Sequence, residues 1–281
     1  MLINSFAKIN LFLEVVGLQS NNYHEIDTVF GSIDLCDTLR FALTKKPSIK
    51  LLSNLPEMVS ESNLVYKVAK YLADLYCPKH GIEIHLEKRI PIAAGLGGGS
   101  SNAAATIQAL NILWDIGLNL EEMMSIGAKY GSDIPYFFIG GTARGTGYGS
   151  TIQPLEDIVL DNILLVNPNI GISSKEAYTL YDLQKDNNER TEQMVHSSHI
   201  YYNGLESVVE QKYEDIRVIN ENLRFMGADV SMMSGSGSTC FGIFKNSEKM
   251  GISQEFFNTK GYWTECTKTT TREEYKRCFQ S

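Results

Sequence analysis

Seven residues in the first half of the sequence have the composition of a phosphate-binding loop. Positions 95–101 read GLGGGSS, and alanines occupy 103–105. Phosphate oxygens are bound well by several backbone N–H groups that point the same way, and side chains would block that approach. The hydroxyls of Ser100 and Ser101 suit either a helix cap or a bond to phosphate or to a metal-bound oxygen. This stretch is therefore the first candidate for chemistry.

The glycine run does not fit the two commonest nucleotide-binding motifs. A Walker A loop needs a lysine directly after its last glycine, and Ser100 follows Gly99. The dinucleotide fingerprint that starts at Gly95 and Gly97 needs a third glycine at position 100, where the same serine stands. The alternative without chemistry is a flexible glycine connector.

The elements on either side of the run favour phosphate binding over a connector. Residues 82–87 read IEIHLE, an alternation of apolar and polar residues that predicts a strand. Residues 100–117 predict a helix whose apolar side chains form one stripe and which stops at Gly117. The members of that stripe are Ala103, Ile107, Leu110 and Trp114. A glycine-rich turn between a strand and a helix start is the arrangement that binds phosphate.

Other segments predict an α+β protein. Residues 3–14 alternate like a half-buried strand, which puts Lys8 and Asn10 on one face. A helix is predicted behind Ser62 or Asn63, ending near 78–81, and a second one behind Asn119, ending at 131. Further strands are predicted at 38–43, 48–52, 162–168 and twice within 229–244, helices at 173–182 and 204–227, and a polar surface loop at 183–199. A weak domain boundary falls near residue 150.

Composition narrows the class of partner. The formal net charge is −8 and the sequence pI is about 5.2, which argues against a broad nucleic-acid surface and favours small-molecule partners. The five cysteines are odd in number and show no C-x-x-C spacing, so a reducing cytoplasm is expected. The first 17 residues contain Lys8, Asn10 and Glu14, and fit neither a signal peptide nor a membrane span.

Four motifs carry a resemblance to a known family. PIAAGLGGGSSNAAA at 91–105 resembles the phosphate loop of the galactokinase, homoserine kinase, mevalonate kinase and phosphomevalonate kinase (GHMP) superfamily. Together with AKINLFLEVVG at 7–17, NYHEIDTVF at 22–30 and GSDIPYFFIGG at 131–141, it resembles the kinases of 4-diphosphocytidyl-2-C-methyl-D-erythritol. The resemblance implies a two-domain α+β fold, with an ATP-binding domain at 1–150, a C-terminal domain at 151–281 and the active site in the cleft between them.

The resemblance also implies an activity and a set of residues. ATP, with Mg²⁺ on its phosphates, would phosphorylate the 2-hydroxyl of the acceptor in the non-mevalonate isoprenoid pathway; Asp133 would be the general base and Lys8 its partner. Substrate contacts map onto Asn10, Tyr23, His24, Ser174 and Tyr178. ATP contacts map onto Pro91, Ile92, Ala93, Ala94, Gly95, Leu96, Gly97, Gly98, Gly99, Ser100 and Ser101. No protein residue is expected to hold a metal ion, and a monomer or homodimer is expected.

Each of these roles has a plainer alternative. Asp133 before Pro135 is also a normal helix cap, and Lys8 is also a normal surface lysine. Tyr23 and Tyr178 suit stacking on a cytosine and His24 suits its edge, but Tyr178 could simply pack on its neighbour three positions on.

Three smaller motifs also carry alternatives. The turn SGSGST at 234–239 resembles a motif that approaches phosphate or substrate, and is equally well explained as a hairpin turn. His196 and His199 are expected to be solvated rather than zinc ligands. Relatives commonly have Glu at Ser150 and ND-x-E where this chain has NGLE at 203–206, and neither difference touches the proposed chemistry.

At the level of the whole protein, two rival functions remain. One is a GHMP kinase of a smaller alcohol or phosphate monoester, and the other is a nucleotide-binding regulatory protein without transfer activity. The motif NYHEIDT argues against the first rival, because a small acceptor offers no base to stack. The presence of both Lys8 and Asp133 argues against the second.

Overall fold

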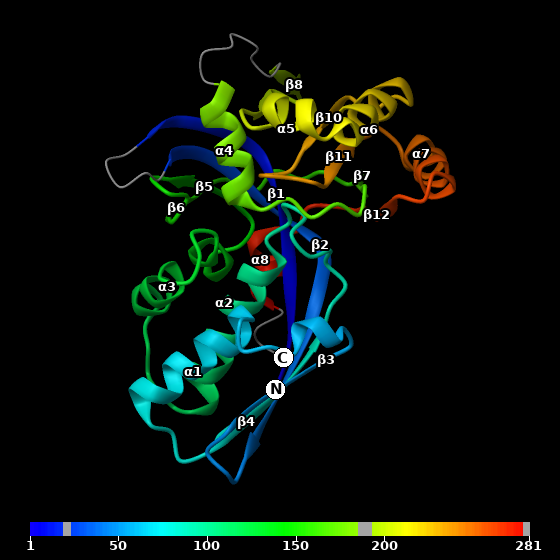
Figure 1. Cartoon of the computed structure of the whole chain (residues 1–281). Coiled ribbons are helices and arrows are strands. Elements are labelled where there is room, and N and C mark those ends of the chain that lie inside the picture. Colours follow the sequence, from blue (N-terminus) through cyan, green and yellow to red (C-terminus); the bar gives the residue numbers. More distant parts are fainter. Residues whose placement is uncertain (19–23, 185–192, 278–281) are drawn as a thin grey trace.

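The long antiparallel strands at the start of the chain lie in the middle of the larger of two sheets. In a computed structural model that describes residues 1–18, 24–184 and 193–277, they belong to an eight-stranded sheet (Figure 1). Its main path runs β3 (Ile49–Ser53), β4 (Gly81–Glu87), β2 (His24–Thr44), β1 (Leu2–Leu18), β9 (His199–Asn203) and β8 (Met194–His196). Beside this path β5 (Thr142–Thr146) pairs with β2 and with β6 (Thr151–Pro154).

A smaller sheet is built from the later part of the chain. Its order is β10 (Val230–Met233), β11 (Cys240–Ile243), β7 (Ile163–Asn167) and β12 (Trp263–Thr267), all antiparallel. Strand β9 lies parallel to β1, with Leu13 opposite Asn203, so the chain returns to the first sheet after residue 150. The division into domains at 1–150 and 151–281 stays a prediction.

Helices cover the two sheets on separate sides. Figure 1 shows α1 and α2 along the long strands with α3 beside them, and α5, α6 and α7 around the smaller sheet. Their bounds are α1 Leu64–Tyr76, α2 Gly98–Leu113, α3 Leu120–Ala128, α4 Ser174–Gln184, α5 Glu206–Lys212, α6 Glu214–Phe225, α7 Ser247–Thr259 and α8 Arg272–Arg277. Two 3₁₀ turns, η1 Pro56–Met58 and η2 Ile134–Phe138, complete the list. Among the described residues, none of these helices combines the length and the apolar character that crossing a bilayer needs.

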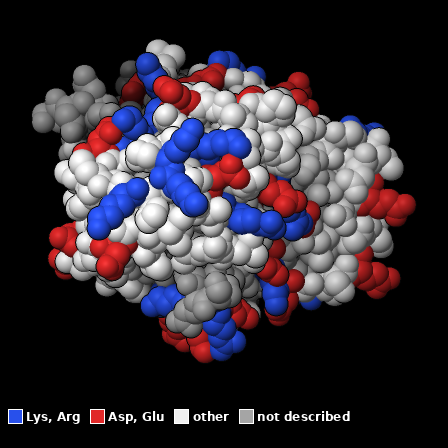
Figure 2. All heavy atoms as spheres, turned by 90° about the horizontal axis from the view of Figure 1, so that it is seen from below, with Lys and Arg blue, Asp and Glu red and all other residues white. Residues whose placement is uncertain are grey.

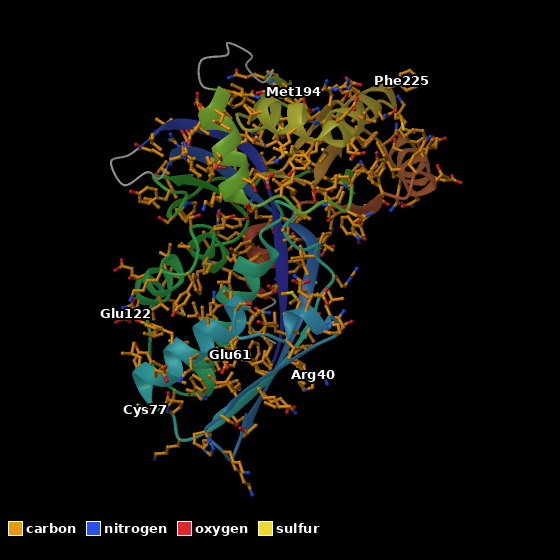
Figure 3. The ribbon with its side chains drawn as sticks, viewed as in Figure 1. Arg40, Glu61, Cys77, Glu122, Met194 and Phe225 are labelled. Carbon is orange, nitrogen blue, oxygen red and sulfur yellow. The ribbon has the colours of Figure 1, made fainter. Side chains whose placement is uncertain are left out.

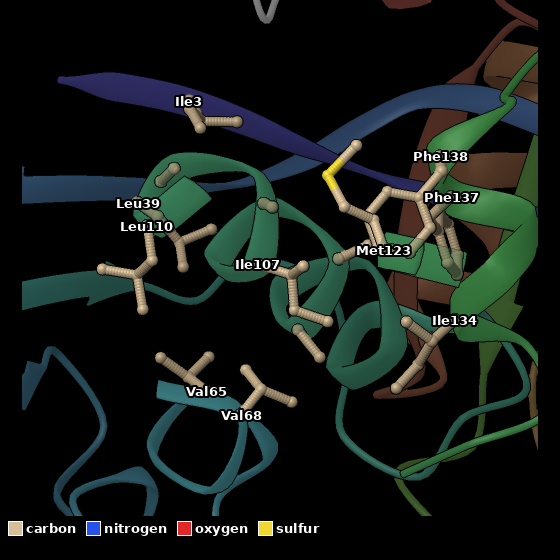
Figure 4. Close-up of a cluster of buried hydrophobic side chains, with 14 of the residues drawn as sticks. Ile3, Leu39, Val65, Val68, Ile107, Leu110, Met123, Ile134, Phe137 and Phe138 are labelled. Carbon is tan, nitrogen blue, oxygen red and sulfur yellow. The ribbon is translucent and has the colours of Figure 1, made fainter. Parts of the chain in front are cut away.

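The first core fills the space between the large sheet and its helices. Figure 4 shows Ile3 and Leu39 from the strands facing Ile107 of α2, with Val68 of α1 on the far side of that helix. These side chains are at most 1% exposed. Alanines at 103–105 let α2 lie close to the sheet, and the apolar contacts on both sides of this helix hold it in place. The phosphate-loop helix is thus the most firmly packed helix of the site.

Strand β1 is buried on both faces from position 5 to position 11, so the prediction of a half-buried strand is wrong there. The reason is that the second part of the molecule packs on the face that would otherwise meet solvent. Ile9 and Leu11 lie in the same apolar cluster as Ile163 and Leu165 of β7. The periodicity of a strand does not reveal a partner that comes 150 positions later.

The pairing of β1 with β2 shifts register at a bulge after Phe6, where Asp34 and Leu35 of β2 have no partner on β1. Before the bulge, Ser5 donates a hydrogen bond to Ser101 Oγ of α2 at 2.6 Å. After it, Lys8 faces the loop that precedes α2, and the backbone N–H of Lys8 donates to Leu96 O at 3.0 Å. Bulges commonly re-aim side chains next to active sites. The expected common face of Lys8 and Asn10 is confirmed, since their side chains are hydrogen bonded.

The helix boundaries confirm some predicted caps and correct others. Asn63 accepts a hydrogen bond from Val65 N, and Asn119 forms a complete capping box with Glu122, so both asparagine caps are confirmed. Helix α2 begins two residues earlier than predicted, with Gly97 as its cap. Ser100 and Ser101 therefore lie in the first turn of α2 and do not cap it.

Two further segments differ from the prediction. The helical stretch predicted at 204–227 is two helices, because the chain turns at Tyr213 between α5 and α6. The polar loop predicted at 183–199 includes the end of α4 and the hairpin of β8 and β9, in which His196 pairs with His199. Its centre, 185–192, lies outside the described residues.

The surface carries charges of both signs. Figure 2 shows Lys and Arg side chains beside Asp and Glu side chains on the face seen from below. Exposed ion pairs on the surface of the protein include Lys50–Glu83, at 2.8 Å. At the far ends of the molecule, Figure 3 shows Cys77 after α1 and, on the opposite side, Phe225, which is 91% exposed at the end of α6.

Candidate active site

A cavity of about 1190 Å³ lies between the larger sheet with its helices and the smaller sheet with its helices. Most of the residues predicted to do chemistry line this cavity. The cavity is lined from one side by β1, by the start of β2 and by the loop before α2. From the other side it is lined by α4 and by the loop between β10 and β11. The segment before η2, at 128–133, also lines the cavity, as do Met58, Leu64, Tyr148 and Ser150.

The loop before α2 has the backbone that its glycines predict. Ala93, Gly95 and Gly97 have φ angles of 51°, 77° and 68°, a region in which glycine carries no steric penalty. A Cβ added at Gly95 would lie 2.0 Å from Ser234 O, so no other residue fits there without movement. The loop leads directly into the N-terminus of the 16-residue helix α2, where free N–H groups and the helix dipole favour an anion.

Nine of the eleven residues predicted to contact ATP line the cavity. They are Pro91, Ile92, Ala93, Ala94, Gly95, Gly97, Gly98, Gly99 and Ser100. The other two, Leu96 and Ser101, are about 1% exposed and point into the protein. Leu96 belongs to an apolar cluster, and Ser101 Oγ accepts its hydrogen bond from Ser5. Of the two serine hydroxyls, the one at position 100 is therefore the one available to a phosphate.

Lys8 is held tightly beside this loop. Its Nζ donates to Asn10 Oδ1 at 2.5 Å and lies 3.4 Å from Asp133 Oδ2. The same nitrogen lies 5.5 Å from the centroid of the Phe30 ring. Asn10 in turn donates to Thr28 Oγ1 at 2.8 Å. Only 4% of the Lys8 side chain is exposed, so the alternative of a surface lysine is wrong.

Asp133 stands at the start of η2 and presents its carboxylate to the cavity. It is the cap residue of η2, followed by Pro135, but its side chain makes no capping hydrogen bond. The side chain is 30% exposed and pairs with Lys8. Burial, and next the charge of Asp133, raise the pKa of the Tyr178 hydroxyl on the opposite wall. The carboxylate therefore faces both a fixed cation and the cavity, as a proton acceptor needs.

The glycine-serine turn at 234–239 reaches the same place from the smaller sheet. It joins β10 to β11 as a hairpin and also contacts the phosphate loop, while its approach to phosphate or substrate stays a prediction. Ser234 Oγ donates to Gly95 O at 3.1 Å, and Thr239 N donates to Ala94 O at 3.2 Å. Gly235 and Ser236 line the cavity.

Sequence reasoning missed a buried ion pair directly behind the phosphate loop. Asp37 of β2 is fully buried and pairs with Lys88 Nζ. Its carboxylate also accepts hydrogen bonds from Arg89 N at 2.7 Å, Ile90 N at 2.9 Å and Asn102 Nδ2 at 2.9 Å. These donors lie before the loop and in the first turns of α2, so one carboxylate fixes both ends of the loop.

Lys88 of this pair also lines the cavity. Its pKa is lowered, mainly by burial, against the opposing effect of Asp37. The available signal in the sequence was a lysine and an arginine at 88–89, a few positions before the glycine run that starts at Gly95.

Three of the five residues predicted to contact the acceptor, His24, Ser174 and Tyr178, line the cavity. The ring of His24 stacks on Tyr178, with centroids 4.7 Å apart and planes at 15°. His24 Nε2 is hydrogen bonded to Asp182 Oδ1 at 2.8 Å, a partner that sequence reasoning missed although it lies one helical turn after Tyr178. Ser174 Oγ lies 3.3 Å from Ser236 Oγ.

Two of these acceptor predictions have a different outcome. The side-chain amide of Asn10 lines the cavity but is hydrogen bonded to Lys8 and Thr28. Tyr23 lies outside the described residues.

Metal-ligating clusters are not part of this site. In the ranges that the structure describes, no group of three or more His, Cys, Asp or Glu side chains is arranged to hold an ion. His196 lies in the β8–β9 hairpin, and its Nδ1 is 3.5 Å from Asp229 Oδ2. A cation in the cavity would therefore have to be held largely by phosphate oxygens and water.

The arrangement unites three requirements of phosphoryl transfer to an alcohol: an anion-binding helix N-terminus, a fixed lysine and an exposed carboxylate beside it. Comparison with known families agrees. Residues 63–141 match the GHMP kinases N terminal domain and residues 179–262 match GHMP kinases C terminal. A crystal structure of a mevalonate kinase shares the fold, with a TM-score of 0.67 at 14% identity over 96% of this chain and 99% of that one. Fold and site thus define a GHMP kinase.

Relatives of higher identity narrow the class. A 4-diphosphocytidyl-2-C-methyl-D-erythritol kinase of Thermoanaerobacter pseudethanolicus is 41% identical over 259 residues, 88% of this chain and 89% of the relative. One of Geobacillus kaustophilus is 38% identical with the same coverage. A crystal structure of 4-(cytidine 5'-diphospho)-2C-methyl-D-erythritol kinase superposes with a TM-score of 0.77 at 26% identity, covering 96% of this chain and 100% of that one. The chain belongs to the 4-diphosphocytidyl-2-C-methyl-D-erythritol kinase family.

Proposed function

We propose that this protein transfers the γ-phosphoryl group of ATP to the 2-hydroxyl of 4-diphosphocytidyl-2-C-methyl-D-erythritol. The reaction would yield the 2-phosphate and ADP in the non-mevalonate isoprenoid pathway. The observation that carries the proposal is the Lys8–Asp133 pair, 3.4 Å apart beside the phosphate loop. Membership of the family supports the choice of acceptor.

In the proposed mechanism, Asp133 accepts the proton of the acceptor hydroxyl while the hydroxyl oxygen forms its bond to the γ-phosphorus. The bond between that phosphorus and the β,γ-bridging oxygen breaks, and ADP leaves. Lys8 stabilises the negative charge that builds up on the phosphoryl oxygens. Because Asn10 holds the Lys8 ammonium in place, little reorganisation is needed when the charge develops.

The loop residues that line the cavity would hold the ATP phosphates through backbone N–H groups, with the Ser100 hydroxyl beside them. Mg²⁺ bound to ATP would neutralise part of the phosphate charge. The donors present fit an ion carried in by the nucleotide, since Mg²⁺ usually takes one or two protein oxygens and completes its shell with phosphate and water. Asp133 and Ser100, which both line the cavity, would be the protein oxygens to serve it.

The acceptor would lie between this centre and α4. Tyr178 and Tyr23 would flank the cytosine, His24 would bind its edge, and Ser174 would contact the diphosphate side. In the structure the His24 ring stacks on one face of Tyr178, so a base that stacks on that same face would displace the imidazole. The two-domain division, a cytoplasmic location and a monomeric or homodimeric state belong to the same proposal.

The decisive experiment measures ADP release with Mg-ATP and the cytidylyl acceptor, beside homoserine, mevalonate and phosphomevalonate. We expect turnover with the cytidylyl acceptor alone, and a loss of 10²–10⁴-fold in kcat for Asp133→Asn. Turnover with another acceptor would refute the substrate. Absence of turnover with all four acceptors, while ATP still binds, would favour the regulatory alternative.

A further inference from the structure

The turn between β10 and β11 is held from behind by two buried side chains, one from the last residue of β9 and one from the first residue of α5. Asn203 Nδ2 donates to Met233 O at 2.7 Å and to Gly235 O at 2.8 Å. Glu206 Oε2 accepts from Met233 N at 2.5 Å. Asn203 is fully buried and Glu206 is 4% exposed. We call this pair the turn clamp; it fixes three polar groups of the turn backbone.

The residue between the clamped positions, Ser234, touches the site directly. Its Oγ donates to Gly95 O of the phosphate loop at 3.1 Å and accepts from Asn10 N of β1 at 3.2 Å. At the next position, a Cβ added to Gly235 would lie 2.9 Å from Asn10 Oδ1 and 3.3 Å from Lys8 Nζ. Ser234 and Gly235 therefore connect the turn clamp to the phosphate loop and to the Lys8–Asn10 hydrogen bond.

We infer that Asn203 and Glu206 are positioning residues for phosphoryl transfer, although neither lines the cavity. By fixing Met233 and Gly235 they fix Ser234, and through it the phosphate loop and the strand that carries Lys8. Misplacement of reacting groups by about 1 Å lowers rates on the order of a hundredfold, so a clamp at this distance acts on kinetics as well as on folding. The inference rests on the proposed function for its kinetic readout.

The two clamp residues differ in the hydrogen-bonding group that each supplies to the turn. Asn203 supplies two N–H donors to carbonyls that would otherwise be buried without partners. Glu206 is needed as an acceptor. Burial, reinforced by the charge of Glu210, raises its pKa to about 8, so it is largely protonated near neutral pH. Glutamine at this position therefore keeps the bond from Met233 N, whereas alanine removes it.

The test compares Asn203→Asp with Asn111→Asp, a matched control. Asn111 also links its amide to a loop backbone, donating to Leu118 O at 2.9 Å and accepting from Leu118 N at 2.8 Å, but at the far end of α2. Both changes are isosteric and remove amide donors. At a temperature where each variant is folded, we expect Asn203→Asp to lower kcat/KM for ATP about tenfold or more, and Asn111→Asp and Glu206→Gln to stay within about threefold of the parent.

Two further measurements keep the inference open to refutation. If Asn203→Asp does not fold, Ser234→Ala leaves the clamp intact and breaks its link to the site, and the same loss is expected. Mg-ATP affinity by calorimetry, without acceptor, tests the clamp even if the proposed acceptor is wrong. Equal ATP affinity and equal kcat/KM in Asn203→Asp, Ser234→Ala and the control would show that the clamp only supports the fold.

Discussion

The side chain of Lys8 is almost completely buried, and its proposed role depends on that burial. Charges interact far more strongly where water is excluded, and a fixed cation needs no reorganisation as charge develops on a phosphoryl group. Lysine has three N–H donors; in the structure one is donated to Asn10, and Asp133 lies 3.4 Å from the same nitrogen as its ion-pair partner. A further donor is then available to the transferred group. The residue is held by its neighbours before any ligand arrives.

Replacing Lys8 with methionine tests this role. We expect kcat to fall on the order of 10²–10³-fold. We also expect a modest fall in melting temperature, because the buried Asn10 Oδ1 loses its donor, whereas the Asp133 carboxylate, 30% exposed, stays accessible to water. Steady-state kinetics and thermal unfolding measure the two effects. Lys50→Met, at a lysine that is 61% exposed in its pair with Glu83, is the control and should leave kcat unchanged. A value for the Lys8 variant within threefold of the parent would contradict the mechanism.

At the scale of elements, two loops from different sheets form one structure. The phosphate loop and the turn at 234–239 share hydrogen bonds at Ala94 and Gly95, and neither has room to move without the other. Behind them, Asp37 ties the start of the loop to the first turns of α2. The precision of the site thus comes from contacts between loops and from one buried carboxylate.

Gly95→Ala tests the contact between the loops, with Gly117→Ala as control. Both glycines have φ near 80°, but a Cβ at Gly117 meets nothing within 4 Å, whereas one at Gly95 meets Ser234 O at 2.0 Å. The control should lose about 1–2 kcal/mol from backbone conformation alone. We expect Gly95→Ala to lose about 1–3 kcal/mol more, together with most ATP affinity. Denaturant unfolding and calorimetry measure these quantities, and equal losses in the two variants would contradict the close approach.

Asp37→Asn tests the anchor of the phosphate loop. Removing one partner of a buried pair leaves Lys88 uncompensated, so we expect a loss of about 3–5 kcal/mol in the free energy of unfolding. Asp27→Asn breaks an exposed pair with Arg144 and should lose about 1 kcal/mol or less. Urea unfolding of both variants at one pH gives the comparison. A similar small loss in both would show that the buried pair is already well solvated.

At the scale of the whole molecule, a buried acid makes stability depend on pH. Glu206 has its pKa raised to about 8 by burial and by Glu210, while Met233 N, Arg224 and Asn220 act in the opposite direction. The pKa of Glu210 is also raised, mainly by burial, and Cys240 faces the same acids. The folded protein therefore binds more protons than the unfolded chain between roughly pH 4.5 and 8.

The sign follows from this excess of bound protons. The contribution of Glu206 to stability is fully present below the unfolded pKa and is lost as pH rises through about 8, with a slope of up to about 1.4 kcal/mol per pH unit. Glu206→Gln should flatten the decrease, as measured by urea unfolding from pH 5 to 8.5. An unchanged slope in this variant would assign the pH dependence to other groups.

Local sequence signals predicted much of the site. The strand, glycine run and helix around 95–101, the caps at Asn63 and Asn119, and the shared face of Lys8 and Asn10 all follow from periodicity and cap chemistry, and the structure confirms them. These features depend on residues only a few positions apart. Family resemblance supplied the roles of Lys8 and Asp133, which no spacing would reveal.

The remaining features depend on contacts that are distant in sequence. Asp37 of β2 forms an ion pair with Lys88, 51 positions later in the sequence, and Asn203 donates a hydrogen bond to Gly235 O in the turn that follows β10. Burial of both faces of β1 depends on β7, and nothing in residues 3–14 announces that partner. An aspartate or asparagine in an extended segment reads as a solvated polar residue until the fold places a donor or a carbonyl beside it.

The parallel pairing of β1 with β9 also has a consequence for synthesis. Phe12 and Leu13 lie on an edge of β1, where they pair with Tyr202 and Asn203 of β9. On the ribosome, the β1–β2 hairpin is complete long before that partner leaves the exit tunnel. Nascent chains that stop short of residue 203 therefore leave this edge of β1 open to chaperones and to other nascent chains. Chains that extend past residue 203 by the length of the exit tunnel can pair this edge with β9.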